Sequence, residues 1–133
     1  MSEPAPPFTG AHFRVLIGET EVGFCHVSRL HVADGPAAPK EADAVRSPAS
    51  VVLRRALSQD KALYRWRQRT AAGKEDPQVI TVHQCEAGGD RILNTWLLHG
   101  CRPMRWSGPE FNALSGDVLW EEIEVSWERL EWR

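Results

Sequence analysis

The alternation of apolar and polar side chains predicts a chain built mainly from β-strands. Phe13, Val15 and Ile17 recur at every second position of residues 12–18, so one face of that strand is clearly apolar. The same spacing of two returns in later segments, among them the alternating run QVITVHQC. Together these patterns predict six strands, at residues 12–18, 22–31, 51–53, 78–85, 91–101 and 118–127.

One stretch, residues 51–69, predicts a strand that turns into the only convincing helix of the chain. Ser58 stands where a helix N-cap is expected, because its hydroxyl can accept a hydrogen bond from a backbone N–H of the first turn. Asp60 is expected in that first turn, where the helix dipole favours a negative charge. Leu63 and Trp66 share one face of the predicted helix, so this face is expected to pack on the sheet.

The segments between the predicted strands carry turn signals. Residues 19–21 are expected to turn the first strand into the second as an antiparallel hairpin, and residues 87–90 (AGGD) have the composition of a second hairpin turn. Residues 102–115 are punctuated by proline and glycine and are expected to form a connection. Glu121 lies in phase with the apolar residues of the last strand, so we expect it to need a buried partner or water.

These elements predict a mainly β fold with one flanking α-helix, a small two-sheet β-barrel or sandwich. The expected core residues are Phe13, Val15, Phe24, Leu53, Leu63, Trp66, Trp96, Ile123 and Val125.

Length and composition narrow the classes of function. The 133 residues suffice for one domain, which we place at residues 11–133 after an extended, proline-rich arm at residues 1–10. The net charge of −2 gives no electrostatic reason to expect a nucleic acid partner, and no apolar run is long enough for a membrane span. The N-terminus has no basic flank and no apolar stretch, so we expect no secretory signal. Six tryptophans predict broad apolar contacts in a core or at a subunit interface, and four crowd the last quarter: Trp106, Trp120, Trp127 and Trp132.

Catalytic and cofactor motifs are missing from the sequence, and one weak metal-binding pattern is present. His83 and Cys85 are two positions apart, as are His99 and Cys101, so each pair is expected to share a strand face and the four could hold zinc. The alternative is that the cysteines are buried as small hydrophobic residues. Three widely spaced cysteines fit free thiols in a reducing compartment.

The long segment at residues 32–50 is expected to be a loop with a function in assembly. It holds little to bury, and loops of this length in a compact domain are commonly functional. Charges of both signs suit a contact at the rim of an interface, and the candidate contact residues are Asp34, Lys40, Glu41, Asp43 and Arg46.

The order of these elements resembles the tail-tube protein family of contractile phages and phage-tail-like injection systems. The resemblance spans residues 8–130. It rests on six segments in order: FRVLIG (13–18), GFCHVSRL (23–30), VVLRRAL (51–57), LYRW (63–66), WLLHGCRP (96–103) and FNALSGDVLWEEIEV (111–125). Arg29 and Ala56 stand where the family pattern has glycines.

The resemblance implies a structural protein that is not an enzyme and needs no cofactor. It implies hexameric rings that stack into a hollow inner tube, with the loop at residues 32–50 between rings and neighbouring subunits. Its implied partners are further copies of itself, a sheath, and baseplate or spike proteins. Assembly is expected in the cytoplasm, as part of a phage tail or of a particle that is released. The first alternative is a tube-initiator or baseplate adaptor ring of the same fold. A non-tube interaction module or a small zinc protein ranks below it.

Overall fold

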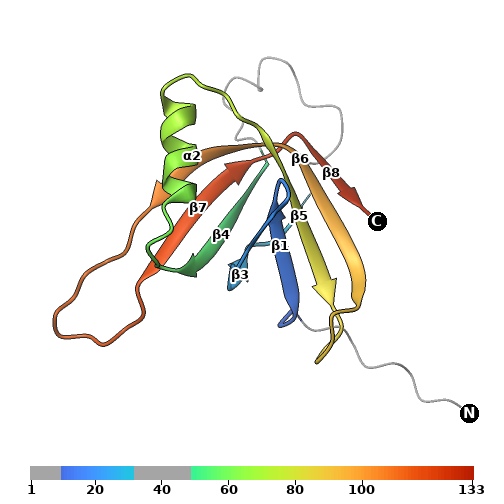
Figure 1. Ribbon diagram of the computed structural model, residues 1–133, viewed down its shortest axis with the longest axis horizontal. Coiled ribbons are helices and arrows are strands. Elements are labelled where there is room, and N and C mark those ends of the chain that lie inside the picture. Colours follow the sequence, from blue (N-terminus) through green and yellow to red (C-terminus); the bar gives the residue numbers. More distant parts are fainter. Residues whose placement is uncertain (1–9, 32–48) are drawn as a thin grey trace, which may run out of the picture.

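Two antiparallel sheets that share one long strand form the protein in the computed structural model, which describes residues 10–31 and 49–133 (Figure 1). Among these residues there are eight strands and one helix. They are β1 (Phe13–Ile17), β2 (Thr20–Val22), β3 (His26–Val27), β4 (Ser50–Ala56), α2 (Ala62–Ala71), β5 (Gln78–Cys85), β6 (Ile92–Ser107), β7 (Trp120–Ser126) and β8 (Arg129–Trp132). The predicted mainly β fold with one flanking helix is confirmed, and all its strand pairs are antiparallel within the described residues. No helix of the described part is both long and apolar enough to cross a membrane.

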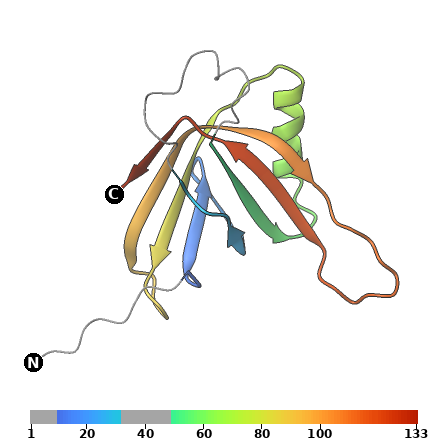
Figure 2. The ribbon, with the colours of Figure 1, turned by 180° about the vertical axis from the view of Figure 1, so that it is seen from behind.

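Strand β6 belongs to both sheets. Its first half pairs with β5 on one edge and with β8 on the other, and β5 is followed by β1 and β2. Its second half pairs with β7, which is followed by β4 and β3. In both views the two sheets meet at one end of the protein and spread apart toward the other, and β6 bends where it passes from one sheet into the other (Figures 1 and 2). The helix lies against β6.

The expected end of this strand at Cys101 is wrong, because β6 continues through Pro103 to Ser107. Proline cannot donate a hydrogen bond to a ladder and is tolerated at bulges and strand edges. Both conditions hold here. A register shift separates Pro103 from Arg105, and the pairing with β5 ends at Cys101. The same bulged region contains Gly100 at φ +68°, so the strand can bend where the two sheets separate.

The predicted second strand at residues 22–31 is also wrong. The turn takes only two residues, beginning with Gly18 at φ +61°, so Thr20 and Glu21 already belong to β2. After Val22 the chain crosses to the other sheet and pairs only briefly as β3. Strand β8 is not among the predicted strands; it continues the edge contact of β7 along β6.

The helix begins four residues after the predicted cap Ser58. Ala62 is its first residue, and the side chain that accepts the Ala62 N–H is Asp60, at 2.9 Å. The Ser58 hydroxyl instead accepts the Asp60 N–H at 3.2 Å. Asp60 therefore precedes the helix rather than lying in its first turn, and together the two side chains order the turn that leads into it.

The core lies where the two sheets and the helix meet. The helix contributes Leu63 and Trp66, as its apolar spacing predicted. Trp66 also donates its indole N–H to the backbone oxygen of Asp76 at 2.9 Å, so its polar atom is satisfied. Of the nine expected core residues, Phe13 and Trp96 are partly buried against this cluster, and the other seven are buried: Val15, Phe24, Leu53, Leu63, Trp66, Ile123 and Val125.

Candidate assembly surface

The segment between β6 and β7, residues 108–119, projects from the body of the protein (Figure 1). From here on, the arm means this segment and not residues 1–10. It contains no helix or strand. Three of its large apolar side chains lie in solvent: Phe111 is 79% exposed, Leu114 98% and Val118 57%. Exposed apolar side chains gathered on one projection are typical of a contact site for another protein.

Local hydrogen bonds hold the tip of the arm in shape. The Asn112 side chain accepts the Leu114 N–H at 3.0 Å, and its backbone oxygen accepts the Ser115 N–H at 3.1 Å. The Ser115 hydroxyl then accepts the Asp117 N–H at 3.1 Å. An open hollow of about 980 Å³ is lined by both sides of the arm and by the adjoining ends of β6 and β7. The two sides of the arm therefore do not pack on each other. The arm is therefore a shaped loop whose apolar residues have no cover of their own.

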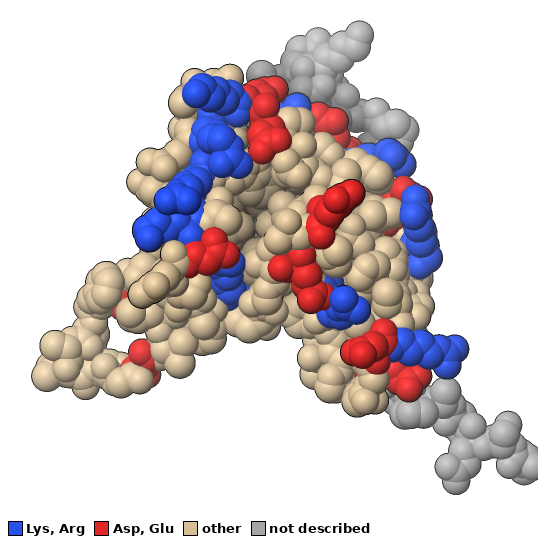
Figure 3. Space-filling model, in the orientation of Figure 1, with Lys and Arg blue, Asp and Glu red and all other residues tan. Residues whose placement is uncertain are grey.

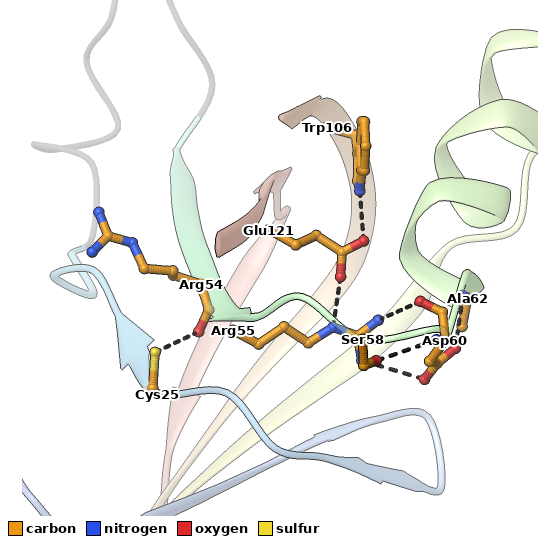
Figure 4. A network of polar contacts seen from close by, with 8 residues as sticks. All are labelled: Cys25, Arg54, Arg55, Ser58, Asp60, Ala62, Trp106 and Glu121. Carbon is orange, nitrogen blue, oxygen red and sulfur yellow. Dashed lines mark hydrogen bonds and ion pairs between the residues drawn. The ribbon is translucent and has the colours of Figure 1, made fainter. Parts of the chain in front are cut away.

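A buried ion pair anchors the base of the arm (Figure 4). Glu121 lies just after the arm and is only 2% exposed, and Arg55 on β4 is 7% exposed. One Glu121 oxygen accepts the Arg55 Nε–H at 2.6 Å, and the other accepts the indole N–H of Trp106 at 2.9 Å. Because Trp106 precedes the arm, the carboxylate of Glu121 ties the two ends of the arm together. The predicted need of Glu121 for a partner is confirmed.

Arg55 carries this network on to the helix. Its guanidinium donates to a side-chain oxygen of Asp60 at 3.3 Å and to the Asp60 backbone oxygen at 3.2 Å. The hydrogen bond from the Ala62 N–H, together with the nearby Arg55 charge, lowers the pKa of Asp60 below its ordinary value. The base of the arm and the start of α2 thus form one connected polar unit.

A pocket of about 280 Å³ lies between α2 and the β1–β2 hairpin. Leu63, Trp66 and Val22 give it apolar walls, and Arg55 and Asp60 line it as well. The view in Figure 3 shows a recess on this face, beside the basic side chains that follow α2. No residue of the arm lines this pocket within the same chain.

The four residues of the weak zinc pattern do not come together. A register shift between Gln84 and Cys85 turns Cys85 into the interior, so it does not share a face with His83. His83 instead contacts the hydroxyl of Thr95 at 2.8 Å, and burial lowers its pKa.

The second pair of the pattern is separated in the same way. The bulge around Gly100 buries Cys101, and burial raises the pKa of this thiol to about 12. His99 instead contacts a carboxylate oxygen of Glu131 at 3.0 Å. The expectation of shared faces is therefore wrong, because β-bulges interrupt the alternation. Across residues 10–31 and 49–133, no three His, Cys, Asp or Glu side chains are grouped to hold a metal ion.

The predicted contact loop and the observed arm are different segments. Most of residues 32–50, including Asp34, Lys40, Glu41, Asp43 and Arg46, lies outside the described residues. The sequence predicts a connection at residues 102–115 and a strand from Val118, but β7 begins only at Trp120, so Val118 belongs to the arm. Its signal was three apolar residues, Phe111, Leu114 and Val118, in a segment too rich in glycine and proline to form a core element.

Comparisons with known proteins identify a family and a fold. The model of the family described as T4-like virus tail tube protein gp19 matches residues 9–131. No curated protein sequence matches the chain.

Three solved structures show the same fold at low sequence identity. A chain of the sheath–tube complex of the PVC extracellular contractile injection system, in the extended state, is similar with a TM-score of 0.80 and 21% identity, over 96% of this chain and 91% of that chain. A chain of the PVC sheath/tube terminator is similar with a TM-score of 0.83 and 21% identity, over 97% and 98% of the two chains. A chain of the anti-feeding prophage baseplate gives 0.71 and 19% identity, over 100% and 97%.

Proposed function

We infer the function of this chain from its family, since it belongs to the T4-like virus tail tube protein gp19 family. We propose that it forms rings, most simply hexamers, and that these rings stack into the hollow inner tube of a contractile injection system. The family is structural and not enzymatic, and the chain is a component of a phage tail or a tail-like injection particle. The formation of rings, the stacking of these rings and assembly in the cytoplasm belong to the proposal.

The observation that carries the proposal is the exposed apolar arm. Burying a leucine or phenylalanine side chain stabilises a structure by about 1.5–3 kcal/mol, so Phe111 and Leu114 favour association strongly once a partner covers them. The buried ion pair at the base holds the arm in place, so part of the ordering is complete before association.

Open sheet edges support the same function. Within the described residues, β2 and β3 end the strand order, and β8 pairs only with β6. An unpaired edge tends to add a strand from another molecule, and a closed ring of identical subunits is one way to cover such edges. A ring subunit thus gives a reason for both the arm and the edges.

The proposed partners are further copies of the chain, a surrounding sheath and baseplate or spike proteins. Similar chains occur in a sheath–tube complex and in a baseplate, which is the reason for including these partners. The contact loop at residues 32–50 remains part of this proposal, as a contact between stacked rings.

A specialised ring at one end of the tube is the second candidate. It is favoured by the likeness to a chain of the sheath/tube terminator and to one of a baseplate. Arg29 and Ala56, which replace glycines of the family pattern, fit such a specialised role as initiator or adaptor.

Electron microscopy of the purified protein over a series of increasing concentrations tests the proposal, with sedimentation velocity on the same samples. Rings that stack into tubes support the tube subunit. Rings that stay single in the presence of preformed tubes, and bind only their ends, support the terminal ring. A dispersed monomer at the highest soluble concentration would refute both.

A further inference from the structure

The arm and the pocket are complementary surfaces that do not meet within one chain. Figures 1 and 2 both show the arm projecting away from the body of the protein. The pocket is lined by residues of β1, β2, β4, β5, α2 and the segments beside them, without any residue of the arm. The arm therefore remains available to a second molecule.

The size and the apolar walls of the pocket suit the side chains of the arm. A cavity of roughly 150 Å³ is enough for a benzene molecule, so a pocket of about 280 Å³ has room for a phenylalanine ring or a leucine side chain. Leu63 and Trp66 at its inner side are held by the core, and half-buried Ile17 and Val22 add accessible apolar surface at its walls. Phe111 and Leu114 are the most exposed large apolar residues of the arm.

The charges are complementary as well. The arm carries Glu110 and Asp117 and no basic residue, whereas α2 beside the pocket carries Arg65, Arg67 and Arg69 and no acidic residue. The acidic side chains at the pocket already face basic partners of their own chain: Glu21 contacts Arg14, Asp60 contacts Arg55 and Asp76 contacts Arg69. Because Arg69 is paired with Asp76, the basic charge that α2 adds beyond these pairs comes from Arg65 and Arg67. An acidic arm is therefore attracted to the helix side of the pocket.

We propose that the arm of one copy docks its Phe111 and Leu114 side chains into the pocket between α2 and the β1–β2 hairpin of a second copy. The inference rests on the proposed function and specifies which surfaces join the subunits. A patch and a pocket at different places on one molecule make a heterologous contact, which repeats from copy to copy and can close into a ring. Each subunit then gives one arm and receives one arm.

Disulfide trapping between singly substituted proteins tests the contact directly. Cys25 is replaced by serine because it is exposed, whereas Cys85 and Cys101 are buried. One protein then carries Leu114→Cys on the arm, and the other carries Thr20→Cys at the exposed rim of the pocket. The two are mixed, allowed to assemble and oxidised, and the covalent dimers are read on a non-reducing gel. As a matched control, Met104→Cys replaces Thr20→Cys, since Met104 is exposed and lies outside the pocket.

The proposal expects dimers from Leu114→Cys with Thr20→Cys, and few from either protein alone or from the control pair. A single chain that carries both substitutions is expected to give a ladder of larger species. Dimers of Leu114→Cys alone would mean that arms contact arms, which overturns the proposal. Equal trapping by the Met104→Cys control overturns it too. Rings in the microscope without the expected dimers overturn the pocket contact and leave the tube function standing, whereas neither rings nor dimers would refute both.

A second measurement does not depend on cysteine chemistry. Leu114→Asp is expected to raise the concentration needed for assembly at least ~10-fold, because the free energy of burying one leucine corresponds to that factor or more. Its thermal unfolding as a monomer is expected to stay unchanged, since Leu114 is exposed in the free chain. Ile92→Asp is the control. A change of less than about twofold for Leu114→Asp, or an equal change for Ile92→Asp, overturns the docking.

Discussion

Replacing Glu121 by alanine should destabilise the fold by about 3–5 kcal/mol, the range for removing one partner of a buried ion pair. Glu121 is 2% exposed and uses both carboxylate oxygens. Its removal leaves the buried Arg55 charge with only Asp60, at 3.3 Å, and leaves the Trp106 indole N–H without its acceptor. Since domains of this size are stable by about 5–15 kcal/mol, the loss is a large part of the whole.

A double variant separates the cost of an unpaired charge from the value of the pair. Arg55→Met together with Glu121→Leu removes both charges and fills the space with apolar side chains. Replacing a buried pair in this way is commonly neutral or stabilising, so the double variant should be much more stable than Glu121→Ala. Exposed Arg14 and Glu21 form a matched control pair, and Glu21→Ala should cost far less stability than Glu121→Ala, because solvent screens an exposed pair.

Urea unfolding followed by tryptophan fluorescence measures these differences, at protein concentrations too low for assembly. A cost below about 1 kcal/mol for Glu121→Ala would refute the reasoning, because it would mean that water or Asp60 satisfies Arg55 without the pair. A double variant as unstable as the single one would also refute it, since the damage would then come from lost packing.

Three further predictions follow from the core, the thiols and the contact loop. Trp66→Ala should cost ~3–5 kcal/mol, measured by the same unfolding assay, and a loss under ~1 kcal/mol would contradict its burial. Alkylation of the native protein at mildly alkaline pH, read by mass spectrometry, should modify Cys25 and spare Cys85 and Cys101, because both are buried. Burial also raises the pKa of the Cys101 thiol to about 12, so this thiol stays protonated. Modification of all three at equal rates would contradict this. Deleting residues 35–43 should leave monomer stability nearly unchanged and weaken stacking in sedimentation, whereas normal long tubes would show that the loop is only a spacer.

Local periodicity predicted those elements whose register is uninterrupted. The apolar spacing of two placed Val15, Ile123 and Val125 in the core, and the helical spacing placed Leu63 and Trp66 there. The same reasoning required a partner for Glu121, because a charge in phase with buried residues cannot stay unpaired. It could not name Arg55 and Trp106, which lie 66 and 15 residues away in sequence.

The predictions of strand ends and of shared faces were wrong where β-bulges occur and where one strand belongs to both sheets. Alternation holds only while the ladder is regular, so the shifts beside Cys85 and Cys101 separated the four zinc candidates. Pro103 was read as a break, but it lies at a bulge where the strand has only one neighbour, and β6 therefore passes from one sheet into the other.

The sequence by itself determined the class of fold, the face of the helix that packs inward and the family resemblance, because these depend on local spacing and on the order of motifs. Only the tertiary structure decided which partner satisfies Glu121, where β6 bends, and that Phe111 and Leu114 face solvent rather than a core. Each of these depends on segments distant in sequence, and on whether another part of the chain covers a given side chain. Apolar residues look alike in a sequence whether they are buried within their own chain or wait for another copy to cover them.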